Sequence, residues 1–134
     1  MFGHKSNNTI ESLVGLSTII EGNIYFRGGL RIDGHVKGNV IAEPENDSML
    51  VISEQAKVEG EIRVAHLQVN GEVVGTVYSS AHLELQPKAR ITGDVHYNAL
   101  EMHGGARISG KLTHTQSGEP FLKLAMPELL ASDA

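Results

Sequence analysis

The segment most suggestive of chemistry is Gly105-Ala-Arg-Ile-Ser-Gly110-Lys111, which matches the opening of a phosphate-binding loop. In that loop a Ser or Thr after the lysine binds magnesium, but Leu112 occupies the position here. Similar phrases recur around Gly60 and Gly93, where no strand-to-helix turn is expected to aim backbone amides at a phosphate. We therefore predict a structural repeat at this segment, with no nucleotide site and no cofactor.

Histidine is the second candidate, because solenoid enzymes of the carbonic anhydrase type bind zinc with histidines on their coils. His66 and His82 each precede a leucine that opens a repeat, so they should stack on adjacent coils and face solvent. A catalytic zinc site needs three protein ligands, and His35, His96 and His103 fall at other positions of the repeat. We predict no metal site. Since no Ser-His-Asp set or carboxylate pair repeats at a spacing that suggests a cleft, we also predict no catalytic residues.

The element that positions these residues is a five-residue signature: an aliphatic residue, any residue, Gly, any residue, and another aliphatic residue. A second motif, Leu-x-aliphatic, occurs once in each repeat from Leu30 onward. Its leucine, the leucine marker, recurs about every 17 residues, with one longer interval. A fixed internal period of this size predicts a stacked repeat. The signature occurs at Ile20–Ile24, Ile32–Val36, Val58–Ile62, Val69–Val73, Ile91–Val95 and Ile108–Leu112, and the marker at Leu30, Leu50, Leu67, Leu83 and Leu100.

Within each unit apolar and polar residues alternate, which predicts short strands with one buried face. Glycine falls on the inward parity, where a side chain would collide with the opposite wall, so glycines should form the corners. Three strands and three corners in about 17 residues make one coil of a parallel β-solenoid. The whole chain should contain about six such coils, and the polar run Glu43–Ser48 should bulge out as a loop.

The composition and the distribution of charge argue against several classes of function. The chain has 134 residues, no cysteine and a net charge of −5, with acidic and basic residues mixed along the coils. The absence of cysteine fits a reducing compartment. No basic stripe is present to follow a phosphate backbone, so we do not expect nucleic-acid binding. We see no signal peptide and no apolar run long enough to span a bilayer.

Two tails flank the predicted solenoid, which we place at residues 18–115. Residues 1–17 carry Ile10, Leu13 and Val14 at helical spacing, with Asn8 and Glu11 placed for a capping box. Residues 116–134 contain several apolar side chains interrupted by proline. Either tail could cover an end of the solenoid, since repeat arrays need caps, or could contact a partner or membrane.

The main alternative to a structural protein is a solenoid enzyme, either a hexapeptide-repeat acyltransferase or a metal-dependent enzyme like carbonic anhydrase. The hexapeptide class places an aliphatic residue at every sixth position in coils of near 18 residues. The present repeat alternates every second residue in shorter coils, so the period argues against that class.

The run from about Thr18 to His114 resembles the bactofilins, a family of bacterial cytoskeletal proteins. The resemblance lies in its Gly-x-Val-x-Gly phrases and its Ala-[Lys/Arg]-[Val/Ile]-x-Gly phrases, as at Ala56–Gly60, Ala89–Gly93 and Ala106–Gly110. It implies a single-stranded, right-handed, triangular parallel β-helix that polymerises end to end without nucleotide. It also implies cytoplasmic filaments that scaffold cell-shape and cell-wall proteins at the inner face of the cell membrane. The start of the chain is similar to a short membrane-targeting segment of many members, which selects Met1, Phe2 and Lys5 as membrane-binding residues.

Solenoid physics also predicts self-assembly. The end strands leave N–H and C=O groups unpaired and can template another chain, while the apolar interior can continue across the junction. The expected partner is therefore a second copy of the chain. The residues predicted to form the polymerisation interface are Ile20, Ile24, Leu30, Ile108, Leu112 and Phe121.

Overall fold

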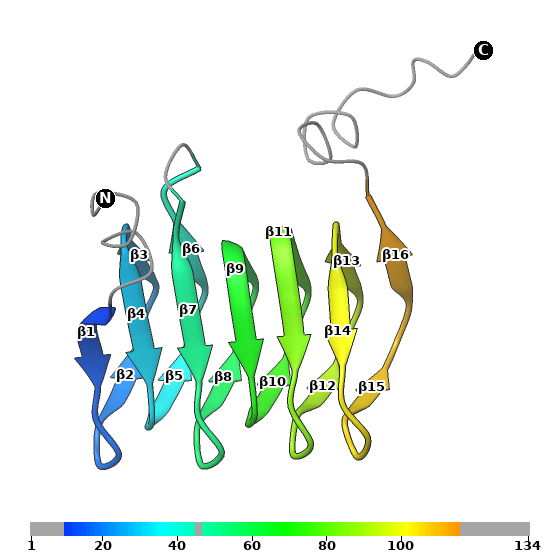
Figure 1. The fold of residues 1–134 in the computed structure, drawn as a ribbon. Helices are drawn as coiled ribbons and strands as arrows, with labels where there is room; N and C mark the ends of the chain where they lie inside the picture. Colours follow the sequence, from blue (N-terminus) through cyan, green and yellow to red (C-terminus); the bar gives the residue numbers. More distant parts are fainter. Residues whose placement is uncertain (1–9, 45–46, 116–134) are drawn as a thin grey trace.

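The computed structural model of the chain describes residues 10–44 and 47–115, which wind into a stack of six coils (Figure 1). All regular elements in these two ranges are β-strands, which confirms the predicted all-β parallel solenoid. The strands are β1 (Ile10–Val14), β2 (Ile19–Glu21), β3 (Ile24–Phe26), β4 (Gly29–Ile32), β5 (His35–Lys37), β6 (Val40–Ala42), β7 (Met49–Ile52), β8 (Lys57–Glu59), β9 (Ile62–Val69), β10 (Glu72–Val74), β11 (Val77–Leu85), β12 (Arg90–Thr92), β13 (Val95–Tyr97), β14 (Leu100–Met102), β15 (Arg107–Ser109) and β16 (Leu112–His114).

Each coil contributes one strand segment to each of three parallel columns. The first column contains β1, β4, β7, the second halves of β9 and β11, and β14. The second contains β2, β5, β8, β10, β12 and β15. The third contains β3, β6, the first halves of β9 and β11, β13 and β16. The right-handed sense and the triangular outline stay predictions.

The leucine marker sets the register of the stack. Leu30, Leu50, Leu67, Leu83 and Leu100 are paired in sequence from coil to coil, as the repeat predicts. The first four side chains are buried and belong to one apolar core that runs through the stack. Each buried leucine of this kind contributes about 1.5–3 kcal/mol relative to an exposed one.

Glycine is required at one corner column for a reason that the sequence did not reveal. A Cβ atom on Gly75 would lie 2.1 Å from the carbonyl oxygen of Gly60 in the preceding coil, and one on Gly93 would lie 2.2 Å from that of Gly75. The predicted collision with the opposite wall was therefore wrong. The obstacle is the backbone of the neighbouring coil, because adjacent coils approach along the stacking direction at this corner.

The expectation of a helix near the N-terminus was also wrong. Ile10–Val14 forms the strand β1, which pairs in parallel with β4 and supplies the first strand of coil 1. Val14 is 7% exposed and pairs with Ile32, so it extends an inward column of the core. The apolar spacing that suggested a helix is overridden by strand pairing and burial against the second coil.

The polar segment between β6 and β7 is the predicted loop, and the described residues at its C-terminal end contact β9. The buried hydroxyl of Ser48 accepts a hydrogen bond from the Ala65 N–H at 3.1 Å. The Asp47 carboxylate lies 2.7 Å from Nε2 of His66. These contacts fix the point at which the chain enters β7.

Candidate functional site

The C-terminal end of the stack exposes part of the apolar interior. The three strands of coil 6, β14, β15 and β16, pair on one side with coil 5 and have no strand on the other side within the described residues. Leu112 lies above the fully buried Val95, yet 44% of its surface is exposed. Met102 is 46% exposed, and Ile108 is only partly buried. Within residues 10–44 and 47–115, this end is therefore an apolar surface rimmed by unpaired strand edges.

The N-terminal end has the same character. Its strands β1, β2 and β3 pair with coil 2 alone among the described residues. The inward side chains Ile20, Ile24 and Phe26 pack against the core but are only partly buried. Both ends thus present the last members of apolar columns that are closed to solvent farther inside.

The structure separates the residues predicted for the polymerisation interface into three groups. Ile20 and Ile24 lie at the N-terminal end, and Ile108 and Leu112 lie at the C-terminal end. Leu30 is 3% exposed because β1 covers it, so it lies in the second coil and not at an end. Four further predicted residues, Phe121 of the interface and Met1, Phe2 and Lys5 of the membrane segment, fall outside the described residues.

Sequence reasoning missed Phe26 and Met102, which lie in the end coils with their inward faces partly uncovered. It also missed that coil 1 carries large apolar side chains on its outside. The alternation pattern could have found Phe26 and Met102, because both fall on inward parity within the signature coils. The outward apolar residues of coil 1 are Leu13, Leu16, Ile19 and Tyr25.

The sides of the solenoid carry ladders of polar and aromatic side chains. His66 and His82 are paired on adjacent coils, as the sequence predicts. His96 stacks on Tyr78 with ring centroids 4.6 Å apart, and the Arg63 guanidinium lies 4.1 Å from the Tyr78 ring centroid. These contacts run along the stack and hold neighbouring coils in register.

Ion pairs also link neighbouring positions on the sides. The Glu59 carboxylate lies 2.7 Å from Nε2 of His35, and this contact, with help from Lys57, lowers the pKa of Glu59. The Ser53 hydroxyl donates to the Asp33 carboxylate, and this bond, together with Arg31, lowers the pKa of Asp33 against the opposing effect of burial. Both pairs join one coil to the next.

The segment that matched a phosphate-binding loop forms part of an ordinary coil. Its middle is β15, and the corner glycine Gly110 is stacked on Gly93. The described chain continues from this corner into β16 and not into a helix. No helix of the described residues is long and apolar enough to cross a membrane.

The described stack thus exposes core side chains at both ends, while its sides carry polar ladders together with the outward apolar residues of coil 1. The bactofilin family model, described as polymer-forming cytoskeletal, matches residues 12–113. The chain belongs to the bactofilin family. It is therefore a filament-forming cytoskeletal protein and not an enzyme, which sets aside the acyltransferase and carbonic-anhydrase-like alternatives.

Three relatives agree with this family. Bactofilin BacO of Myxococcus xanthus (strain DK1622) is 25% identical over 111 residues, which are 83% of this chain and 85% of BacO. Bactofilin BacP of the same organism is 25% identical over 107 residues, which are 80% of this chain but 43% of BacP. A cryo-EM reconstruction of Thermus thermophilus bactofilin double helical filaments matches with a TM-score of 0.68 and 27% identity, covering 78% of this chain and 99% of that one.

Proposed function

We propose that this bactofilin assembles through the two ends of its solenoid, so that the filament extends along the stacking axis. The observation that carries this proposal is the exposure of the last members of the apolar columns, above all Leu112 and Met102, in a molecule whose interior columns are closed to solvent. A second copy placed against either end continues those columns and pairs the free strand edges.

Burial at the junction is large enough to drive assembly. Full burial of a Leu, Ile, Phe or Met side chain contributes about 1.5–3 kcal/mol. Each end offers several partly buried apolar side chains. When two ends join, each of these side chains contributes part of that burial free energy. The sum offsets an association cost estimated at about 4–15 kcal/mol. Bound nucleotide therefore supplies nothing that the junction lacks, and filaments should form in buffer that contains EDTA and no ATP or GTP.

The test is a charge placed at one end. Leu112→Arg introduces a cation that the junction would bury without a partner, at a cost of several kcal/mol. The variant should keep its β circular dichroism signal and sediment as a monomer or a dimer. A dimer is expected if like ends join, because the unaltered end still pairs. A monomer is expected if unlike ends join.

The matched control is Val74→Arg. Val74 lies on the outward side of β10 in the fourth coil and is also an exposed apolar residue. Negative-stain microscopy should show filaments for Val74→Arg and none for Leu112→Arg. The reverse result would show that subunits associate through their sides and would overturn end-to-end assembly.

We further propose that the filament lies against the inner face of the cell membrane and there scaffolds cell-shape or cell-wall proteins. The N-terminal residues Met1, Phe2 and Lys5 support this through their apolar and basic chemistry and the resemblance already described. A few apolar side chains give one chain only weak membrane affinity, but a filament multiplies the contact by avidity.

Deletion of residues 1–5 should release filaments from liposomes in co-sedimentation and leave assembly intact. If the truncated protein still binds lipid as the full chain does, the N-terminal segment is not the anchor. The outward apolar side chains of coil 1, such as Leu13 and Tyr25, then become the candidate surface.

A further inference from the structure

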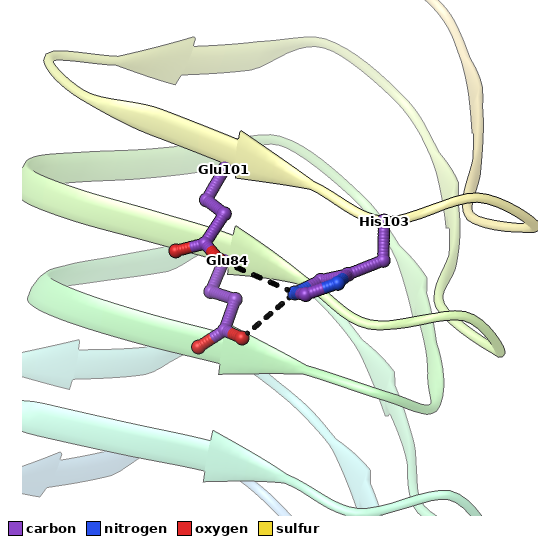
Figure 2. A group of neighbouring side chains, drawn as sticks. All are labelled: Glu84, Glu101 and His103. Atoms are coloured by element: carbon purple, nitrogen blue, oxygen red, sulfur yellow. Dashed lines mark hydrogen bonds and ion pairs between the residues drawn. The ribbon is translucent and has the colours of Figure 1, made fainter.

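Three side chains with metal-binding chemistry converge on the side of the last two coils (Figure 2). Glu84 comes from β11, Glu101 from β14, and His103 from the corner that follows β14. Nε2 of His103 lies 2.9 Å from one oxygen of Glu84 and 3.5 Å from one oxygen of Glu101. Figure 2 shows the imidazole directed at the two carboxylates, which come from neighbouring coils.

The two carboxylates form a like-charge pair that lacks a permanent cation. Glu84 and Glu101 are directly opposite each other in the parallel ladder, and like charges at opposed positions are destabilising. Within residues 10–44 and 47–115, their ion pairs are to histidine alone, from His103 and, for Glu101, also from His82.

Several other carboxylates on the described sides are paired with fixed positive charge. They pair with lysine or arginine at Arg27–Glu43, Arg31–Asp33, Lys57–Glu59, Arg63–Glu61, Lys88–Glu54 and Arg90–Glu72. The ladder position of Glu84 and Glu101 is therefore a place where two negative charges meet without a Lys or Arg. A divalent cation would compensate both charges at once.

We propose that Glu84, Glu101 and His103 bind one divalent transition-metal ion of the Zn²⁺ class. Zinc takes imidazole nitrogen and carboxylate oxygen at about 2.0–2.2 Å, so tetrahedral ligand atoms lie roughly 3.3–3.6 Å apart. The three ligand atoms here all lie within 4.8 Å of one another, which small side-chain rotations bring to that spacing. The mixed nitrogen and oxygen set favours such an ion over Ca²⁺ or Mg²⁺, which prefer oxygen ligands alone. Water completes the coordination.

The fold holds these ligands in place. The backbone N–H of His103 donates to the Leu85 carbonyl at 2.9 Å, and the N–H of Ala106 donates to the His103 carbonyl at 3.2 Å. Nε2 of His82 lies 3.8 Å from the other oxygen of Glu101, beside the proposed site. Because the ligands come from β11, β14 and the following corner, the bound ion acts as a clamp between coils 5 and 6.

The experiment uses the tag-free full-length chain titrated with Co²⁺, whose visible absorption reports coordination, followed by displacement with Zn²⁺. We expect one Co²⁺ per chain. His103→Gln and Glu84→Gln should each weaken binding at least about tenfold, since even residues that only orient metal ligands have effects of that size. His82→Gln should have a smaller effect.

The matched control is His66→Gln. His66 lies near one carboxylate, that of Asp47, and is paired with His82 on the next coil, but it is outside the proposed ligand set. The His66→Gln variant should bind Co²⁺ as the unaltered chain does. Unaltered binding by His103→Gln, or an equal loss with His66→Gln, would overturn the proposal, because the ion would then bind the histidine ladder or the surface at large.

A second measurement tests the clamp itself. Hydrogen exchange of the β14 amides should slow on addition of Zn²⁺ in the unaltered chain and not in His103→Gln. His103 is partly exposed on the side of the stack, so the substitution should leave the β circular dichroism signal unchanged. Exchange that is insensitive to Zn²⁺ in the unaltered chain would contradict a site that joins coils 5 and 6.

Discussion

The third and sixth coils contain the same five-residue signature in different surroundings. Val58 and Ile62 of the third coil are 0% exposed. Ile108 and Leu112 occupy the same columns in the sixth coil, yet Ile108 is only partly buried and Leu112 is 44% exposed. Among the described residues, the third coil has a neighbouring coil on both sides and the sixth has a neighbour on one side. Burial in this fold therefore depends on position in the stack as much as on residue type.

The glycine corners show the same difference between an end coil and an interior coil, here at the N-terminal end. Gly22 and Gly75 belong to one corner column, with positive φ angles of 136° and 146°. A Cβ atom on Gly75 would collide with the preceding coil, whereas one on Gly22 would meet nothing within 4 Å. The two glycines share a conformation, but only the interior one is also confined by a neighbour.

The largest expected loss of unfolding free energy comes from alanine substitution at these two glycines. Both variants place a Cβ atom at positive φ, which costs about 1–3 kcal/mol. Gly75→Ala adds a backbone collision and should lose more than about 4 kcal/mol of unfolding free energy, a size reserved for severe disruption. Urea titration followed by circular dichroism measures the difference. Equal losses in the two variants would show that conformation, and not coil contact, selects glycine at this corner.

The loss of unfolding free energy should also differ between Ile62→Ala and Leu112→Ala, and this difference should be smaller. The two positions share one inward column, but Ile62 is fully buried. Removing its side chain should cost about 2–5 kcal/mol, as for other core truncations. Leu112→Ala should cost less than about 1 kcal/mol in dilute protein, yet it should raise the concentration needed for filaments. A large loss at Leu112 in dilute protein would mean that residues 116–134 cover this end within the same chain.

The smallest effect concerns acid stability at the contact between the second and third coils. The pKa of Asp33 is lowered chiefly by the hydrogen bond from Ser53. The ionised form thus stabilises the fold above the ordinary aspartate pKa of about 3.9, and this contribution is lost as the pH falls through the lowered value. Ser53→Ala should raise the pKa of Asp33 in an NMR titration and reduce stability above that range, while leaving it unchanged at lower pH. An unmoved pKa would assign the shift to Arg31 instead.

Much of the fold was predictable because its determinants are local and repeated. Alternation of apolar and polar residues specifies strands with one buried face, and the leucine marker specifies which residues stack. The pairing of Leu50 with Leu67, and of His66 with His82, followed from that spacing alone. The apolar character of Ile108 and Leu112 likewise marked them as interface candidates.

Other features were decided only when the coils came together. Ser12 occupies the position that a leucine fills in the later coils. Nothing local therefore distinguished β1 from a helix until its pairing with β4 buried Val14. For the same reason Leu30 was predicted at an end that β1 in fact covers.

The sequence by itself determined the period, the strand faces and the stacking register, because each depends on residue types repeated along the chain. The tertiary structure decided which coils form the ends of the described stack, why the corner at Gly75 excludes a side chain, and that His103 meets Glu84. Those features are contacts between different coils. Their geometry depends on how the chain turns at each corner, which residue spacing does not specify.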